Sequence, residues 1–253
     1  MTTLQEAHKK NKTLIVLTGD IGTGKTTILN AFINGLENDA FVATIANPTL
    51  DTLSFYNLIA DSFNFAKRFK YESKFITYFS SFLRIACKFN RRVILIIDEA
   101  HKLSPSILEK LLIFSNYNLL HNTDSHLPTT KSYRKAINIY LVGQNELSQL
   151  LTKKDFTLFQ KRIEVSFNIE PLTEQETKDY IEHRLHLAGA TREIFTRKAI
   201  REVYNFSRGY PRLINIICDN ALLAGYFKQV NVIKPKIIQR CVKKLNHLTA
   251  PCN

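Results

Sequence analysis

The sequence predicts a doubly wound α/β domain, built on a five-stranded parallel sheet and followed by a small all-helical domain. Up to about residue 170, short apolar runs alternate with amphipathic helical periods. This alternation is typical of parallel strands covered by helices on both faces of a sheet. From Thr173 onward only helical periods recur. We therefore expect one domain over residues 1–170 and a second, lid-like domain over residues 171–253.

Five apolar runs predict the strands of the sheet. They lie at residues 13–18, 41–45, 93–97, 137–142 and 163–167. The run at 93–97 is apolar at every position, as expected for a strand buried on both faces at the centre of a parallel sheet. The other runs are short and bounded by polar or turn-forming residues, which also favours strands.

Amphipathic periods between these runs predict the helices. In the first domain they lie at about 4–10, from the loop after the first strand to about 36, and at 53–63, 73–89, 104–114, 145–152 and 156–161. In the second domain they lie at about 173–188, 196–206, 211–227 and 234–246, with Gly189, Gly209, Pro211 and Pro235 at their boundaries. The polar stretch from His121 to Lys135 is predicted to be a surface loop.

The strongest functional signal is a glycine-rich segment between the first strand and the next helix. Its residues are Gly19, Asp20, Ile21, Gly22, Thr23, Gly24, Lys25, Thr26 and Thr27. They match the pattern GxxxxGK[ST], in which glycines curl the backbone so that N–H groups and a helix N-terminus face phosphate. Lys25 then reaches the β- and γ-phosphates, and the Thr26 hydroxyl ligates Mg²⁺. We therefore predict that ATP and Mg²⁺ bind here.

Two adjacent carboxylates follow the central strand. Asp98 and Glu99 come directly after the run at 93–97, at the carboxyl edge where parallel sheets bind ligands. We expect Asp98 to orient Mg²⁺, directly or through water, and Glu99 to polarise the water that attacks the γ-phosphate. The alternative is a helix cap followed by a surface acid, which the upstream glycine-rich segment disfavours.

Polar residues near other strand ends are weaker candidates. Gln144 is placed to contact the γ-phosphate or the attacking water, and Asn47 to hold Glu99 inactive. Both are also ordinary strand-end residues. His101 completes the letters DEAH, but the single nucleotide-binding domain argues against a helicase. We interpret His101 as a local hydrogen-bonding side chain rather than a catalyst.

Two arginines are candidates for contacts with phosphate. Arg162 precedes the last strand, far along the sheet from the glycine-rich segment, which suits an arginine finger that reaches a neighbour's nucleotide. Lys161 is a rival for this role, and a basic surface turn is the alternative for both. Arg212 follows Pro211 in the first turn of a helix, where a cation opposes the helix dipole, so a phosphate partner is expected.

The charge and the cysteines limit the partners and the environment. The 253 residues carry 35 basic and 22 acidic side chains, a formal net charge of +13. Residues 171–253 are the more basic part, with 14 basic and 7 acidic side chains. DNA or anionic lipid is therefore a candidate partner, and solvated helix faces are the alternative. The four cysteines show no metal-ligand spacing, which predicts reduced thiols and a cytoplasmic protein. No apolar run approaches the ~20 residues of a membrane-spanning helix.

Several segments together resemble the AAA+ ATPases of the ExeA/MshM type, the general secretion pathway protein A family of P-loop NTPases. They are GDIGTGKTT, ILIIDEA, IYLVGQNEL, LFQKRI, PLTEQETKDYIEHRL and SRGYPRLINIICDNALL. The resemblance implies that Lys25, Thr26, Asp98 and Glu99 are Walker residues, that Gln144 is sensor 1, Arg162 the arginine finger and Arg212 sensor 2. It also implies an ATP-dependent homo-oligomer.

The resemblance leaves more than one function open. The first is an ATPase that drives assembly or remodelling with protein partners in secretion or type IV pilus biogenesis. The alternative is an ATP-dependent DNA-binding regulator of transposition, because related target-selecting ATPases are similar in sequence and the basic surface suits DNA. A third is a nucleotide switch without turnover. Family members often have further segments before the first strand or after the lid, and they usually have Gln at the position of His101.

Overall fold

The computed structural model describes residues 2–36, 40–48, 51–116, 118–121 and 132–249. Its contacts divide the chain into two compact units. The first consists of Met1–Gly19 and Lys25–Ile169, and the second of Asp20–Gly24 and Glu170–Asn253.

Within the described residues, five parallel strands form the sheet of the first unit, in the order β2-β3-β6-β1-β7. The strands are β1 (Leu14–Gly19), β2 (Ala40–Ile45), β3 (Arg92–Ile97), β6 (Asn138–Val142) and β7 (Val165–Ile169). Val16 of β1 pairs with Leu141 on one side and Ser166 on the other. The predicted doubly wound sheet is thus confirmed, with β3 lying between β2 and β6 as expected for a strand apolar on both faces.

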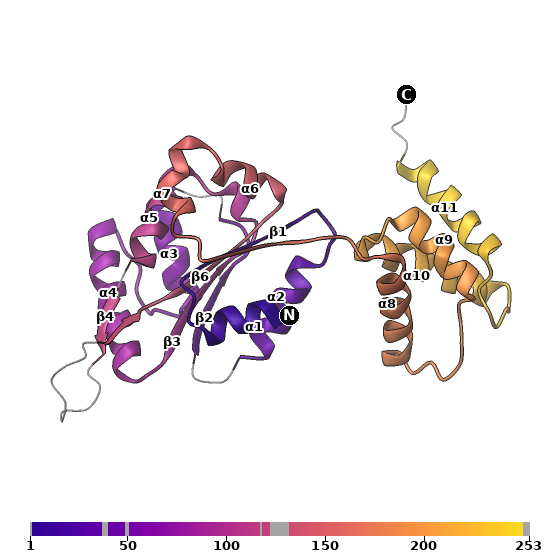
Figure 1. Cartoon of the computed structure of the whole chain (residues 1–253), viewed down its shortest axis with the longest axis horizontal. Coiled ribbons are helices and arrows are strands. Elements are labelled where there is room, and N and C mark those ends of the chain that lie inside the picture. The colour runs from indigo at the N-terminus through magenta and orange to yellow at the C-terminus, as the bar shows by residue number, and fades with distance from the viewer. Residues whose placement is uncertain (1, 37–39, 49–50, 117, 122–131, 250–253) are drawn as a thin grey trace. The chain divides into compact units, whose positions relative to one another are not determined.

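Helices cover both faces of this sheet (Figure 1). On one face lie α1 (Thr2–Lys9) and α2 (Lys25–Asn34), which pack on the side chains of Ile15 and Leu17. On the other face, the helices pack on Leu14 and Val16. They are α3 (Thr52–Ser62), α4 (Glu72–Lys88), α5 (Pro105–Ser115), α6 (Asn145–Leu151) and α7 (Thr157–Gln160), with the short 3-10 helices η1 (Ala100–Lys102) and η2 (Lys154–Phe156). Alternate residues of β1 therefore serve two separate cores.

Aromatic packing holds α3 and α4 together. Tyr56 stacks on Phe75 with ring centroids 4.5 Å apart, and Phe79 packs edge-on against Phe114 of α5 at 5.3 Å. The side-chain amide of Asn57 also clasps the loop between the two helices: its nitrogen donates to the Phe69 carbonyl at 2.9 Å, and its oxygen accepts from the Phe69 N–H at 2.7 Å. Buried hydrogen bonds of a side-chain amide, such as these, favour one conformation of the loop between α3 and α4.

The polar stretch predicted as a surface loop differs from the prediction at both ends. The strands β4 (Asn118–His121) and β5 (Ser132–Lys135) pair antiparallel, with Leu119 opposite Arg134. Residues 122–131, between them, lie outside the described part. Each strand has only four residues, which is too few for an alternating pattern to stand out in a polar sequence.

The second unit contains the predicted helices α8 (Glu174–Leu187), α9 (Arg197–Ser207), α10 (Pro211–Phe227) and α11 (Pro235–Thr249). Helix α8 begins with a capping box in which Thr173 and Glu176 bond each other's backbone N–H groups. Apolar residues of all four helices, such as Ile181, Val203, Ile217 and Ile238, form the core. None of the described helices is long and apolar enough to cross a membrane.

Two glycines of the second unit provide a matched test of backbone packing. Gly189 and Gly209 have φ of +87° and +79°. A Cβ at Gly189 meets nothing within 4 Å, whereas at Gly209 it would lie 1.8 Å from the Leu172 carbonyl oxygen. Gly189→Ala should therefore cost only the left-handed strain, about 1 kcal/mol. Gly209→Ala should cost about 3 kcal/mol or more, because backbone must move. Urea unfolding of both variants checks this, and equal losses would contradict it.

A histidine in α1 should make stability depend on pH. Burial, reinforced by the charge of Arg92, lowers the pKa of His8 to about 4. The unfolded chain therefore binds this proton at a higher pH, so stability falls as pH drops from about 6.5 toward 4 and is unaffected by His8 above that window. Allowing for partial exposure, we expect a loss of about 1 kcal/mol between pH 7 and pH 5. Thermal unfolding at both pH values should show that His8→Gln loses less stability than the wild type between pH 7 and pH 5. His183→Gln, on the exposed side of α8, should lose as much stability as the wild type.

Candidate nucleotide-binding site

The glycine-rich segment joins β1 to α2. Gly22 and Gly24 have φ of +86° and +93°, a region that side chains other than glycine rarely adopt. The Thr23 hydroxyl donates to the Asp20 carbonyl at 2.9 Å and closes the turn. Helix α2 begins at Lys25, so the N–H groups of its first turn lack helical partners. Such a turn followed by a helix N-terminus is a binding site for phosphate.

Lys25 lies across the segment with its side chain buried. The residue is 8% exposed, and its Nζ donates to the Gly19 carbonyl at 2.8 Å. A buried ammonium group requires anionic or carbonyl oxygens around it. The Gly19 carbonyl holds the side chain along the loop, where phosphate oxygens are the matching ligand.

Thr26 and Asp98 meet although they are 72 residues apart. The Thr26 hydroxyl donates to Asp98 Oδ2 at 3.0 Å. The other carboxylate oxygen accepts from the Glu99 N–H at 2.9 Å, and the Asp98 N–H donates to the Ile45 carbonyl at 2.8 Å. The carboxylate is thus fixed from two sides. A hydroxyl beside a carboxylate is a pair of hard oxygen ligands, which fits Mg²⁺ shared with a nucleotide.

Glu99 has an unusual backbone conformation. Its φ of 55° and ψ of 32° are left-handed, directly before η1, which costs an ordinary residue roughly 1–2 kcal/mol. Its Oε2 lies 3.2 Å from Lys102 Nζ and 3.6 Å from His101 Nε2. Strained residues of this kind cluster at functional sites, where the surrounding structure holds them.

His101 connects the end of β3 to the end of β6. Its Nδ1 accepts from the Gln144 N–H at 3.4 Å, while its Nε2 faces Glu99. Gly143 allows this approach, because a Cβ there would lie 3.2 Å from the His101 backbone nitrogen. The predicted hydrogen bonding of His101 is thus confirmed, whereas its lack of a catalytic role stays a prediction. The contacts predicted for Gln144 with phosphate or water, and for Asn47 with Glu99, stay predictions.

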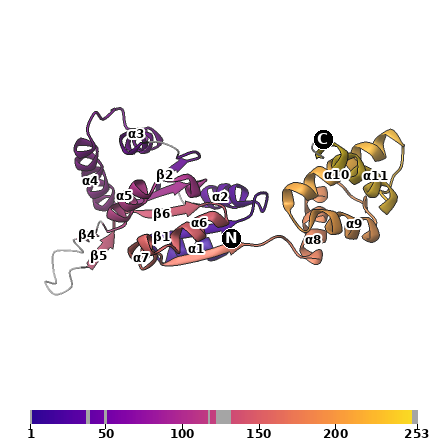
Figure 2. The same cartoon turned by 90° about the horizontal axis from the view of Figure 1, so that it is seen from above.

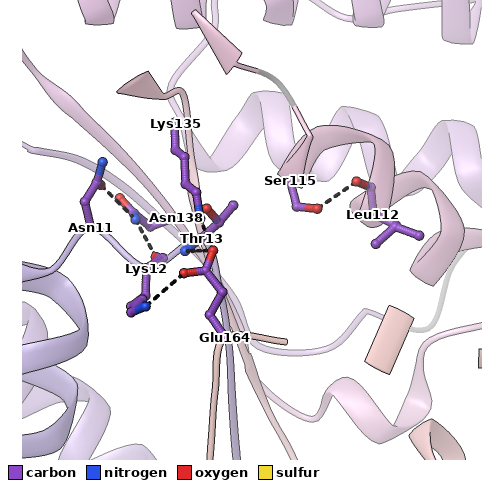
Figure 3. Close-up of polar contacts among 8 residues, drawn as sticks. All are labelled: Asn11, Lys12, Thr13, Leu112, Ser115, Lys135, Asn138 and Glu164. Atoms are coloured by element: carbon purple, nitrogen blue, oxygen red, sulfur yellow. Dashed lines mark hydrogen bonds and ion pairs between the residues drawn. The ribbon is translucent and has the colours of Figure 1, made fainter. Parts of the chain in front are cut away.

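A polar network lies at the opposite, amino end of the strands (Figure 3). Glu164 accepts from the Thr13 N–H at 3.3 Å, pairs with Lys12 at 3.5 Å and also contacts Lys135. Burial, the largest single contribution, acts to raise the pKa of Glu164, but the hydrogen bond and charge of Lys135, together with the Thr13 N–H, lower this pKa overall. The network anchors the segment that follows Arg162, whose own side chain is exposed.

Part of the glycine-rich segment, Asp20–Gly24, belongs to the second unit, and within that unit it contacts residues at the start of α10. The Tyr210 hydroxyl donates to Asp20 Oδ2 at 2.8 Å, and the Arg212 N–H donates to the Gly22 carbonyl at 3.2 Å. The bond to Asp20 raises the pKa of Tyr210. Tyr210 was not among the predicted site residues. Its position between Gly209 and Pro211, beside Arg212, was the available signal.

Among the residues that the structure describes, no group of three or more His, Cys, Asp or Glu side chains is arranged to hold a metal ion. Cys87, Cys218 and Cys241 are free thiols, and burial raises the pKa of Cys218 to about 12. Cys252 lies outside the described residues.

The sequence matches a known family and a curated relative. A family model described as an AAA domain matches residues 7–151. General secretion pathway protein A from Aeromonas hydrophila is 32% identical over 213 residues, which are 84% of this chain and 37% of that protein. The chain thus spans little more than a third of the length of this curated relative.

Solved structures share the fold at low sequence identity. The ORC2 protein of Aeropyrum pernix in its ADP form has a TM-score of 0.62 at 13% identity, covering 96% of this chain and 66% of that one. Cdc6p from Pyrobaculum aerophilum has a TM-score of 0.62 at 19% identity, covering 91% and 60%. The RuvB Holliday junction branch migration motor of Thermotoga maritima has 0.57 at 18%, covering 97% and 66%.

Together, the parallel sheet, the glycine-rich turn and the family match define an AAA+ P-loop NTPase. Within this class, the chain belongs to the AAA domain family and is related to general secretion pathway protein A. The resemblance predicted from the sequence motifs is confirmed at this level.

Proposed function

We propose that the chain binds ATP with Mg²⁺ at Gly19–Thr27 and hydrolyses it to drive assembly or remodelling of a macromolecular complex in secretion or type IV pilus biogenesis. The observation that carries the catalytic part is the contact of 3.0 Å between Thr26 and Asp98, with Glu99 directly after Asp98. This contact gathers a phosphate-binding turn, a pair of metal-ligand oxygens and a candidate base at one edge of the sheet.

Each residue has a definite task in this proposal. The N–H groups of the turn and Lys25 bind the phosphates, and Thr26 and Asp98 hold Mg²⁺, which neutralises charge on the phosphate oxygens when bound. The Glu99 carboxylate accepts a proton from the attacking water. Gln144 orients that water or contacts the γ-phosphate. Arg212, at the start of α10, acts as a sensor of the nucleotide, and residues 171–253 form the lid domain.

The relative favours a secretion role over transposition. General secretion pathway protein A matches 84% of this chain, and the name of that protein places it in a secretion pathway. The partners we propose are therefore proteins of a secretion or pilus system, bound by a homo-oligomer of this chain. The solved structures of ORC2, Cdc6p and the Holliday junction motor RuvB are 13–19% identical to this chain, which supports only a shared fold.

Replacement of Glu99 separates turnover from binding. Glu99→Gln keeps the shape of the side chain but removes the base, so ATP hydrolysis should fall by roughly 100-fold or more while binding of ATP persists. Lys25→Ala should instead abolish binding, because the buried ammonium that faces the phosphates is lost. Phosphate release and equilibrium binding of a fluorescent ATP analogue measure the two effects.

A matched control is Glu109→Gln on the exposed side of α5, which should hydrolyse ATP at the wild-type rate. Hydrolysis that survives Glu99→Gln would refute the role of Glu99. A wild-type chain that binds ATP but never hydrolyses it, alone or with lipid, DNA or partner proteins, would instead indicate a nucleotide switch.

Arg162 is too far from its own glycine-rich segment to act there. Val165 pairs with Ile15, and Ile169 pairs with Gly19, so the start of β7 lies about 13 Å along the strands from the turn. Arg162 precedes that start by three residues, on the side away from the turn. This geometry supports a role as an arginine finger that acts on the nucleotide of a neighbouring subunit.

Mixed oligomers test this role. Arg162→Ala and Glu99→Gln should each be inactive alone, and mixing them should restore part of the activity, because some interfaces then combine an intact finger with an intact base. Rates of ATP hydrolysis over a series of mixing ratios measure the rescue. Lys161→Ala mixed with Glu99→Gln is the control for the rival residue. Absence of rescue at every ratio for Arg162→Ala, with rescue for Lys161→Ala, would assign the finger to Lys161.

A further inference from the structure

More than half of the net charge of the chain lies in one short region. Residues 62–97 carry eight basic side chains and one acidic side chain, a net charge of +7, against +13 for the whole chain. The basic residues are Lys67, Arg68, Lys70, Lys74, Arg84, Lys88, Arg91 and Arg92, and all except Arg92 are exposed. The one acid, Glu72, pairs with Lys110 of α5 at 3.6 Å. The region therefore presents an almost purely cationic surface.

Exposed apolar side chains follow α4, the helix within this region. Tyr71, Tyr78, Ile85 and Phe89 are 67%, 39%, 57% and 69% exposed. Because each helical residue advances about 100° around the axis, these four lie within about 40° of one another. They form a stripe along α4 and its two flanking positions. Lys74 and Lys88 lie beside this stripe on its solvent side.

The hydroxyl groups beside the stripe are already satisfied. Thr77 donates to the Ser73 carbonyl at 2.9 Å, and Ser81 donates to the Thr77 carbonyl at 3.0 Å. A hydroxyl that bonds back to its own helix loses little when water is removed from it. Contact of the outer, solvent-facing side of α4 with an apolar phase would therefore leave neither hydroxyl without a hydrogen-bond partner.

The face is also presented by a rigid helix. Phe75, Phe79, Leu83 and Ala86 on the inner side of α4 are buried in the core. In both views, α4 lies at the outer margin of its unit (Figures 1 and 2). The stripe and its cations thus form an accessible platform about 25 Å long, from the 1.5 Å rise per residue.

We propose that this face of α4 docks on the surface of a bilayer that contains anionic phospholipid. The apolar stripe enters the boundary between headgroups and acyl chains, and the lysines and arginines contact lipid phosphates. Tyrosine suits this boundary because its ring is apolar and its hydroxyl is polar, and lysine stems extend their charge toward the headgroups. The inference does not rest on the proposed ATPase function.

Two other occupants fit the surface less well. A second copy of the chain is disfavoured overall, because the residues outside 62–97 also sum to a positive charge of +6 and two copies therefore repel each other. Nucleic acid would satisfy the cations, but duplex phosphates offer no apolar partner for Ile85 and Phe89. A bilayer with anionic headgroups satisfies both parts of the surface.

Vesicle flotation tests the proposal with the full chain. Wild type should float with phosphatidylglycerol vesicles and not with phosphatidylcholine vesicles. Each cation near an anionic surface strengthens binding roughly fivefold, so Lys74→Gln with Lys88→Gln should lower the partition coefficient roughly 25-fold. Tyr71→Ser with Phe89→Ser should lower it roughly tenfold or more, because apolar contact is lost.

Controls of equal chemistry come from elsewhere in the chain. Lys153→Gln with Lys154→Gln removes two exposed cations, and Tyr226→Ser with Phe227→Ser removes two rings that are 78% and 75% exposed. Both controls should float like wild type. All four variants should keep wild-type circular dichroism and ATP binding, which separates this test from that of the proposed function.

Three results would overturn the proposal. The first is no flotation of the wild type with phosphatidylglycerol vesicles. The second is an equal loss in the α4 variants and in their controls. The third is unchanged lipid binding by the α4 variants together with loss of duplex DNA binding or of self-association, measured by fluorescence anisotropy and by sedimentation.

Discussion

The parallel alignment of β1, β6 and β3 is the constraint on which the candidate site depends. Parallel strands end at a common edge, so the turn after β1 and the acids after β3 meet there although β6 lies between the two strands. The hydrogen bond between Thr26 and Asp98 results from this alignment. A shift of one residue in the pairing would reverse the faces of a strand, and the separate cores on the two faces of β1 prevent such a shift.

The same alignment separates two kinds of chemistry along the sheet. The carboxyl edge carries the groups proposed for phosphate and metal, several of them buried, such as Lys25 and Asp98. The amino edge carries the network around Glu164, which fixes where β1 and β7 begin. Arg162 is placed by the second edge rather than the first. In the proposed oligomer, the carboxyl ends of the strands would thus serve the subunit's own nucleotide, and the amino ends would place Arg162 for the nucleotide of a neighbouring subunit.

Much of this arrangement could be predicted from the sequence because it depends on strong local patterns. The apolar runs, the glycine-rich turn and the acids after β3 each have a characteristic composition, and the fold follows from their alternation. The left-handed conformation of Glu99 could not be predicted, because only the surrounding contacts hold an ordinary residue there. The bond from Gln144 to His101 likewise joins residues 43 positions apart. The short pair of β4 and β5 lacked an alternating pattern.

The cationic face of α4 does not stand out in the sequence for a different reason. By domain, residues 171–253 are the more basic part, whereas the concentration of charge at residues 62–97 is local to one helix and its flanking segments. The amphipathic period of this helix marks its buried side, although Tyr71, Tyr78 and Ile85 recur every seven residues on the other. An exposed apolar period becomes visible only when the residues that form the core are known.

The clasp of Asn57 on the backbone of Phe69 has a consequence for kinetics. A peptide helix that forms only on its target must lose conformational freedom as it binds, which slows association and weakens the complex. Helix α4 is already formed, and Asn57 already holds the loop between α3 and α4 in place. A partner that binds the outer face of α4 therefore meets a preorganised surface. Exchange on and off that face should therefore be rapid, with its lifetime set by dissociation rather than by folding.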